Sequence, residues 1–270
     1  MGRLKVGIIG CGVIGAEIAI ACQDRLSAET ELIALYDIDV KKSAELSSLL
    51  KKDVVVSSSE ELIDRSDLVI EAANSSAARE IVKRSVETGT DVMVMSIGGL
   101  IDSSGLLEAA RKKNVRVFFP SGALCGIDGL KAAKLSYIKS VTLTTRKPPK
   151  GLEGAPYLRE NGIEVSNIKE ETVIFDGTAD NAVKGFPKNI NVASLLSLAG
   201  VGADRTKVRI IAVPGSKKNI HEVEIEGEFG KIVTRTENVP SRKNPKTSEL
   251  AILSAIATLK NMTDSVRMGT

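Results

Sequence analysis

The chain has few of the residues on which metal, disulfide or aromatic chemistry depends. Its 270 residues include no tryptophan, one histidine and three cysteines, and only 3% of the residues are aromatic. Cys11, Cys22 and Cys125 form neither a disulfide framework nor the C-x-x-C pair of a zinc site. Because one histidine cannot complete a ligand cluster either, we expect no structural metal.

Long apolar runs and an excess of one charge are also missing. No stretch approaches the roughly 20 apolar residues of a membrane span, and the first apolar strand begins too early to leave room for a signal peptide. The net charge is only +3, and the basic residues are spread along the chain without an aromatic-rich basic patch. We therefore expect a cytoplasmic protein that binds neither nucleic acid nor a membrane, and the length is sufficient for about two domains.

The most informative positive feature is a glycine-rich turn after a short apolar strand. Val6–Ile9 precede the sequence Gly-Cys-Gly-Val-Ile-Gly at residues 10–15, which has the form G-x-G-x-x-G. In a dinucleotide-binding unit, Gly10 permits the tight turn and Gly12 lets the backbone approach a pyrophosphate. Gly15 lets the following helix pack closely on the strand. This turn predicts a cofactor site, although glycines also serve turns that bind nothing.

The residues around this turn support the same interpretation. The helix that begins near Val13 and Ile14 offers free N–H groups to phosphates. A second apolar segment ends at Asp37, about 20 residues after the last glycine, where an acid binds the adenosine ribose. Asp37 favours NAD over NADP, because a carboxylate repels a 2′-phosphate, although Lys41 and Lys42 partly offset that repulsion. Asp37 is also suited to cap the helix that begins near residue 40.

Apolar strands and helical segments alternate up to residue 120, which predicts an α/β fold of Rossmann type with a doubly wound parallel sheet. After the first two strands, further strands are expected at residues 54–56, 68–70, 92–95 and 115–119, with helices near 40–51, 59–65, 76–88 and 103–113. Ligands gather at the carboxyl ends of such strands, and small residues there, including Ala73, leave space for a cofactor. We interpret Ser75 and Ser76 as helix-capping residues.

Residues 121–244 predict a second, substrate-binding and catalytic α+β domain. Strands are expected at residues 141–145, 207–213, 219–226 and 230–237, with helices near 179–185 and after Asn191. This pattern favours a mixed sheet with helices on one face. Residues 245–270 contain an apolar helix, capped by Thr247 or Ser248, that we expect to pack back on the first domain, residues 1–120.

The single histidine, His221, is the only candidate for imidazole chemistry. In the segment His-Glu-Val-Glu-Ile-Glu at residues 221–226 it shares a strand face with Val223 and Ile225, so we expect it to point inward. A histidine in that position is either a hydrogen-bonded core residue or a general acid/base. A nicotinamide-dependent oxidation favours the second role, because it needs a group that accepts a proton.

Several segments together resemble the L-aspartate dehydrogenase family over the whole chain. They are the glycine turn, residues 119–123, 126–130 and 186–193, the His221 strand, and residues 244–248. The resemblance implies oxidation of L-aspartate by NAD or NADP, through iminoaspartate, to oxaloacetate and ammonia. It also implies that the imine feeds quinolinate and NAD biosynthesis. By the same resemblance, Ala123 and Asn189 bind the nicotinamide cofactor and His221 is catalytic.

The sequence also offers candidates for substrate binding and leaves alternative functions open. Lys188, Asn191 and the N-terminus of the helix after Asn191 are candidates for binding the substrate carboxylates, although Lys188 also suits a solvated loop. The alternatives are a homoserine dehydrogenase or a dihydrodipicolinate reductase, in which Lys184 or Lys188 would be the base. A regulatory module that binds NAD without turnover is a third. A homodimer is expected from fold analogy alone. The family resemblance leaves open whether the imine is handed to a quinolinate-forming enzyme.

Overall fold

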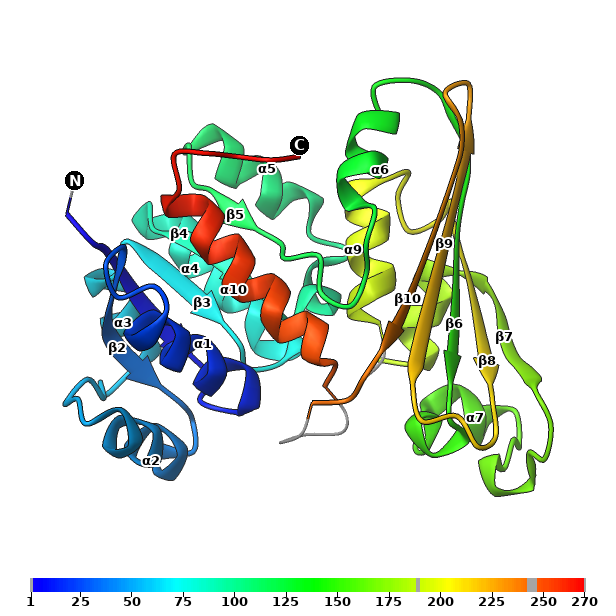
Figure 1. Ribbon diagram of the computed structural model, residues 1–270, viewed down its shortest axis with the longest axis horizontal. Coiled ribbons are helices and arrows are strands. Elements are labelled where there is room, and N and C mark those ends of the chain that lie inside the picture. Colours follow the sequence, from blue (N-terminus) through cyan, green and yellow to red (C-terminus); the bar gives the residue numbers. More distant parts are fainter. Residues whose placement is uncertain (1, 188–189, 242–246, 270) are drawn as a thin grey trace. The chain divides into compact units, whose positions relative to one another are not determined.

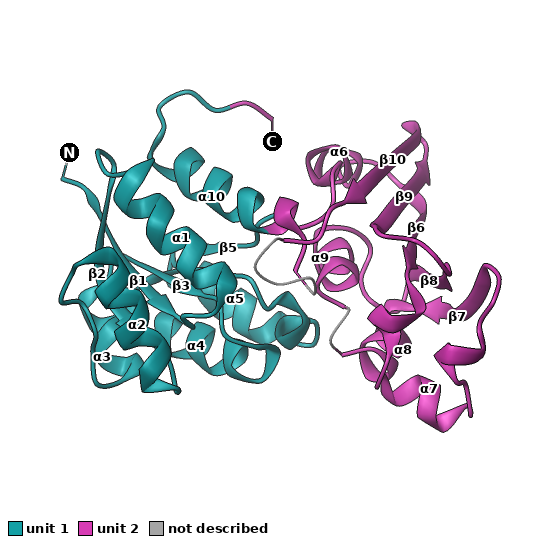
Figure 2. Cartoon of the chain, turned by 60° about the horizontal axis from the view of Figure 1, so that its bottom comes forward, with its two compact units in different colours: residues 1–120, 252–267 teal, residues 121–251, 268–270 magenta. Residues whose placement is uncertain are grey.

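The computed structural model describes residues 2–187, 190–241 and 247–269. The chain divides into two compact units (Figure 2). The first comprises the residues up to Pro120 together with Ile252–Arg267, and the second comprises Ser121–Ala251 and the last residues of the chain. Within the described residues, no helix combines the length and the apolar character that a membrane crossing needs.

The first unit is built on a parallel five-stranded sheet in the order β2-β1-β3-β4-β5 (Figure 1). Its strands are β1 (Leu4–Ile9), β2 (Thr30–Tyr36), β3 (Leu68–Glu71), β4 (Asp91–Val94) and β5 (Val117–Phe118). All neighbouring pairs are parallel. Such strands are buried on both faces, which explains their continuous apolar sequences. The predicted doubly wound fold is confirmed.

One predicted strand is wrong in extent. Residues 54–56 form no strand of the sheet and contribute a single parallel bridge between Leu35 and Val55. The apolar run is only three residues long, and Ser58 then caps the next helix by accepting a hydrogen bond from the backbone N–H of Glu61. The chain therefore leaves the sheet at once. The bridge lies beside β2. If residues 54–56 are counted as the third strand of the chain, so that β3, β4 and β5 become the fourth to sixth, the order is 3-2-1-4-5-6, as in dinucleotide-binding folds.

Helices cover both faces of this sheet. On one face are α1 (Val13–Asp24), α2 (Val40–Leu50) and α10 (Glu249–Thr263); on the other are α3 (Ser59–Arg65), α4 (Ser75–Thr88) and α5 (Ser104–Lys112), and a short 3₁₀ helix, η1, spans Ile97–Leu100. Ala255 and Leu259 of α10 are fully buried in the same core as Ile18 and Cys22 of α1. The C-terminal helix therefore completes the core of the first unit.

Two capping predictions are wrong. Asn74, and neither Ser75 nor Ser76, caps α4, because its extended backbone aims the side-chain oxygen at the first N–H groups of the helix. Asp39, and not Asp37, caps α2 by accepting from the backbone N–H of Lys41. Ser248 directly precedes α10, and its hydroxyl donates to Asn238 Oδ1 at 2.9 Å.

The second unit contains a mixed five-stranded sheet in the order β10-β9-β6-β8-β7. Its strands are β6 (Ile138–Lys147), β7 (Thr172–Thr178), β8 (Thr206–Ala212), β9 (Asn219–Gly227) and β10 (Gly230–Asn238). Only the pair of β6 with β8 is parallel. The sequence did not indicate β7, an edge strand whose pairing slips between Val173 and Phe175 and whose Val173 remains exposed.

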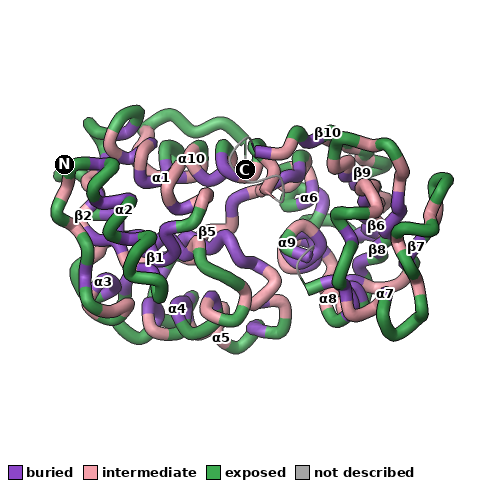
Figure 3. Tube along the Cα trace, turned by 90° about the horizontal axis from the view of Figure 1, so that it is seen from below, coloured by how far each residue is buried: buried purple, intermediate pink, exposed green. Residues whose placement is uncertain are grey.

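Helices cover one face of this sheet and enclose the second core. They are α6 (Ile127–Ala133), α7 (Pro156–Glu160), α8 (Ala179–Gly185) and α9 (Asn191–Ala199), with the short 3₁₀ helices η2 (Pro149–Leu152) and η3 (Val165–Asn167). The core contains a cluster of three aromatic rings, Tyr157, Phe175 and Phe186, with centroids 5.3–5.7 Å apart. Figure 3 shows buried segments inside each unit and exposed turns around them.

Candidate active site

The glycine turn of the first unit has the geometry that its sequence predicts. Gly10 has φ +99°, and a Cβ there would lie 2.5 Å from the carbonyl of Ala72. A Cβ at Gly15 would lie 1.9 Å from the oxygen of Gly10. Both positions therefore require glycine for the turn and for the close packing of α1. These constraints come from the fold itself and need no ligand.

Gly12 is different, because the fold does not require a glycine there. Gly12 is the N-cap of α1, and a Cβ built on it would meet no atom within 4 Å. The space in front of the first turn, where the N–H groups of Val13 and Ile14 lie, is therefore open. A helix N-terminus beside an open glycine fits the pyrophosphate of a dinucleotide, so these residues fit the expected cofactor.

Asp37 connects the end of β2 to the glycine turn. Its side chain is buried, and its Oδ2 accepts a hydrogen bond from the backbone N–H of Cys11 at 2.7 Å. Its Oδ1 accepts from the N–H of Asp39 at 2.9 Å. Asp37 thus holds the end of β2 against the glycine turn, and its role in binding the ribose stays a prediction. Lys41 and Lys42 are exposed nearby on α2.

Glu71 is a buried acid at the cofactor edge of the sheet whose role the sequence analysis missed. Its carboxylate accepts hydrogen bonds from the N–H of Ala73 at 2.8 Å, from the N–H of Ser96 at 2.9 Å and from the Ser96 hydroxyl at 2.8 Å. Burial raises the pKa of Glu71, while these hydrogen bonds oppose the shift. Glu71 therefore ties together the loops after β3 and β4, including the predicted cofactor residue Ala73. An acid ending an otherwise apolar strand was the available signal.

His221 lies on β9 with its side chain in the interior of the second unit. The structure confirms the alternation along this strand, since His221, Val223 and Ile225 are all buried. The ring Nδ1 lies 3.0 Å from the hydroxyl oxygen of Thr145 on β6. Burial, and then the positive charge of Lys147, lower the pKa of His221 to about 3. The imidazole is therefore neutral near pH 7 and able to accept a proton, and its lowered pKa makes it a weaker base than an exposed histidine.

Ala123 belongs to the same part of the second unit. Its carbonyl accepts hydrogen bonds from the Thr236 hydroxyl at 2.8 Å and from Asn238 Nδ2 at 3.1 Å. Thr236 lies directly opposite His221 in the pairing of β10 with β9. Thr236 thus connects the Ala123 carbonyl to the strand pair that carries His221. The sequence analysis missed Thr145, Thr236 and Asn238, because threonines and asparagines in strands carry no motif.

The remaining predicted site residues are exposed or lie outside the described residues. Asn191 is exposed as the first residue of α9, and Lys188 and Asn189 lie outside the described residues. Lys184, the base considered for the alternative enzymes, is an exposed residue of α8 whose Nζ lies 3.6 Å from Asp180 Oδ2. A hollow of about 420 Å³ opens on the polar face of the second sheet, opposite the face that carries His221.

A doubly wound sheet with an open glycine turn, followed by a mixed-sheet unit, defines a pyridine-nucleotide-dependent dehydrogenase. Residues 10–120 match the family described as "Homoserine dehydrogenase, NAD binding domain". Residues 128–262 match the family described as "Aspartate dehydrogenase, C-terminal". The chain belongs to the L-aspartate dehydrogenase family.

Full-length relatives support this assignment. The chain is 51% identical to an L-aspartate dehydrogenase of Methanosarcina barkeri, over 99% of this chain and 100% of that protein. It is 40% identical to one of Nitrosopumilus maritimus, over 98% of this chain and 99% of that protein. A solved structure of aspartate dehydrogenase from Thermotoga maritima aligns with a TM-score of 0.73 at 27% identity, covering 99% of this chain and 100% of that one.

Proposed function

We propose that this protein catalyses the NAD(P)-dependent oxidative deamination of L-aspartate to iminoaspartate, which water converts to oxaloacetate and ammonia. The observation that carries the proposal is the buried, neutral His221 beside Thr145, within the domain that matches the aspartate dehydrogenase family. A bound oxidised nicotinamide would accept a hydride from the α-carbon of the substrate. The chain itself must then bind the substrate and move its protons.

His221 supplies the base for these proton transfers. Among the described residues, Nδ1 is the ring nitrogen with a protein partner, Thr145, so Nε2 is the nitrogen that faces the reaction. Nε2 accepts a proton only in the tautomer in which Nδ1–H donates to the Thr145 hydroxyl. The Thr145 hydroxyl can accept from Nδ1–H, which supports this tautomer, and His221 then removes the proton of the amine and that of the water that adds to the imine carbon.

The cofactor preference depends on Asp37. We infer that NAD is preferred over NADP. The buried carboxylate of Asp37 directly follows β2 and contacts the glycine turn, which supports a role as acceptor for a ribose 2′-hydroxyl. The exposed Lys41 and Lys42 reduce this preference without reversing it. Gly12 and the first N–H groups of α1 would hold the pyrophosphate.

Further parts of the proposal concern the product and the assembly. The chemistry of an imine product supports its use by a quinolinate-forming enzyme in NAD biosynthesis, with direct transfer protecting the imine from water. A homodimer in the cytoplasm remains our expectation and is supported by fold analogy.

Homoserine oxidation is the second candidate, favoured by the description of the family that residues 10–120 match. A spectrophotometric assay of NADH or NADPH formation with L-aspartate, L-homoserine and L-alanine at alkaline pH separates the candidates. We expect turnover with L-aspartate only. His221→Asn should lower kcat by roughly 10²–10⁴-fold and leave NAD affinity unchanged, as expected for loss of a general acid/base. Oxidation of homoserine in place of aspartate, or NAD binding without any turnover, would reject the proposed function.

A further inference from the structure

Lys147, the last residue of β6, is a close neighbour of His221. In the antiparallel pairing of β6 with β9, Thr145 lies opposite His221. Lys147 follows Thr145 by two residues, so it lies on the same face of the sheet, at the diagonal position to His221. The effect of the Lys147 charge on the pKa of His221 agrees with this short separation.

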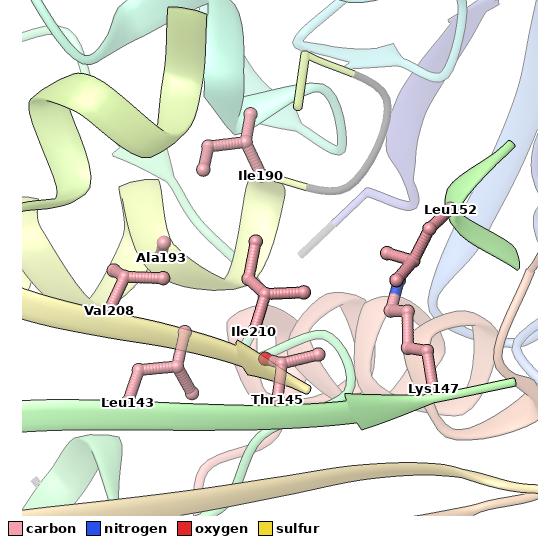
Figure 4. A pocket seen from close by; sticks show the side chains of 8 residues that line it. All are labelled: Leu143, Thr145, Lys147, Leu152, Ile190, Ala193, Val208 and Ile210. Atoms are coloured by element: carbon pink, nitrogen blue, oxygen red, sulfur yellow. The ribbon is translucent and has the colours of Figure 1, made fainter. Parts of the chain in front are cut away.

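Lys147 also borders a small cavity on this face. The cavity has a volume of about 10 Å³, which is room for about one water molecule. Its lining residues are Leu143, Thr145, Lys147, Leu152, Ile190, Ala193, Val208 and Ile210 (Figure 4). Among the described residues of this lining, Lys147 is the one with a charged side chain. Its side chain extends from the end of β6 and brings its nitrogen beside Leu152, and the residue as a whole is half-buried.

The N-terminal end of α9 is a second feature that favours binding of an anion at this cavity. Ile190 is the residue before α9 and Ala193 lies in its first turn, so the cavity borders the N-terminal end of a nine-residue helix. That end carries a partial positive charge and free N–H groups. A lysine ammonium and a helix N-terminus on an otherwise apolar surface form a suitable site for a carboxylate.

We propose that the Lys147 ammonium binds one carboxylate of the amino-acid substrate and so holds the substrate beside His221. This inference rests on the proposed function, in which the substrate carries two carboxylates. Burial lowers the pKa of Lys147 to about 8, so the side chain is mostly cationic at neutral pH. A bound carboxylate also offsets the Lys147 charge next to His221, which makes the imidazole a stronger base when substrate is present.

The first test measures binding without turnover. Succinate and butyrate are titrated into the protein by calorimetry, with and without NAD, because they have the same chain length and differ by one carboxylate. Lys147→Met should weaken succinate binding roughly 10- to 100-fold, the loss expected for a hydrogen bond to a charged group, and should affect butyrate less. Lys150→Met, at an exposed lysine three residues further along, is the matched control and should leave both affinities unchanged.

The second test measures kinetics in the same variants. Lys147→Met should raise the KM for L-aspartate by a similar factor, change kcat less, and leave NAD affinity unchanged. Unaltered succinate affinity and KM in a folded Lys147→Met protein would overturn the inference. If that variant does not fold, Lys147→Gln replaces it, and a retained preference for succinate over butyrate would then overturn the inference. If the wild type binds succinate through Lys147 but does not oxidise L-aspartate, the proposed substrate is wrong and the carboxylate site stands.

Discussion

His221 makes the stability of the protein depend on pH by an amount that can be calculated. The pKa of His221 is about 3 in the folded protein and 6.5 in its ordinary, exposed state. Between these values the unfolded chain binds one proton that the folded protein does not bind. The free energy of unfolding therefore falls as the pH falls, by about 1.36 kcal/mol per pH unit. Above pH 6.5 both states are neutral at this residue, and its contribution is constant.

The free energy of unfolding should be about 2 kcal/mol lower at pH 5 than at pH 8. The reason is that pH 5 lies about 1.5 units below the pKa of the histidine in the unfolded chain. Urea unfolding of the wild type and of His221→Gln at both values measures this loss. Carboxylate titrations are common to the two proteins and cancel in the difference. We expect the stability advantage of the wild type over His221→Gln to shrink by about 2 kcal/mol between pH 8 and pH 5.

A constant difference between the two proteins over this range would refute the buried, neutral imidazole. The chain offers an independent check, because its single histidine gives a single imidazole signal in NMR once any tag is removed. That signal should not titrate between pH 8 and pH 5. A midpoint near pH 6.5 would mean that the ring is accessible to water.

Two further predictions concern the cofactor site. Gly12→Val should abolish NAD binding while leaving the melting temperature nearly unchanged, because a Cβ at Gly12 meets no protein atom within 4 Å and points into the space assigned to the pyrophosphate. Gly15→Ala is the control, which should instead unfold the turn, and undiminished NAD affinity in Gly12→Val by calorimetry would contradict the phosphate assignment. Asp37→Ser should shift the ratio of kcat/KM for NAD and NADP toward NADP by removing both a ribose acceptor and a repulsive charge. Because Asp37 also accepts from Cys11, Asp37→Asn serves as a comparison that keeps one acceptor oxygen, and an unchanged ratio in both variants would reject the ribose role.

The sequence predicted the features that depend on local pattern. The glycine turn, the end of β2 at Asp37 and the inward position of His221 each follow from a motif or from strand periodicity over a few residues. The strand expected at residues 54–56 failed because three apolar residues indicate burial but do not say how long a segment stays paired. The edge strand β7 was missed because its apolar residues do not alternate with polar ones. Its pairing slips between Val173 and Phe175, and Val173 is exposed.

The parts of the site that sequence could not supply depend on pairing between distant strands. Thr145 and His221 are 76 residues apart, and only the pairing of β6 with β9 places them 3.0 Å from each other. Lys147 became a candidate in the same way, because nothing in its local sequence separates it from other loop lysines. Glu71 and Ser96 likewise meet only because β3 and β4 are neighbours in the sheet.

The return of α10 to the first unit has a consequence for synthesis of the protein. Most of the first unit precedes the second unit in the chain, yet Ala255 and Leu259 in its core follow the second unit. During translation, the apolar face that carries Ile18 and Cys22 therefore stays uncovered until the second unit has emerged completely. The nucleotide-binding unit is thus started before the second unit and finished after it, and a ribosome that stops before α10 releases a chain with an exposed core.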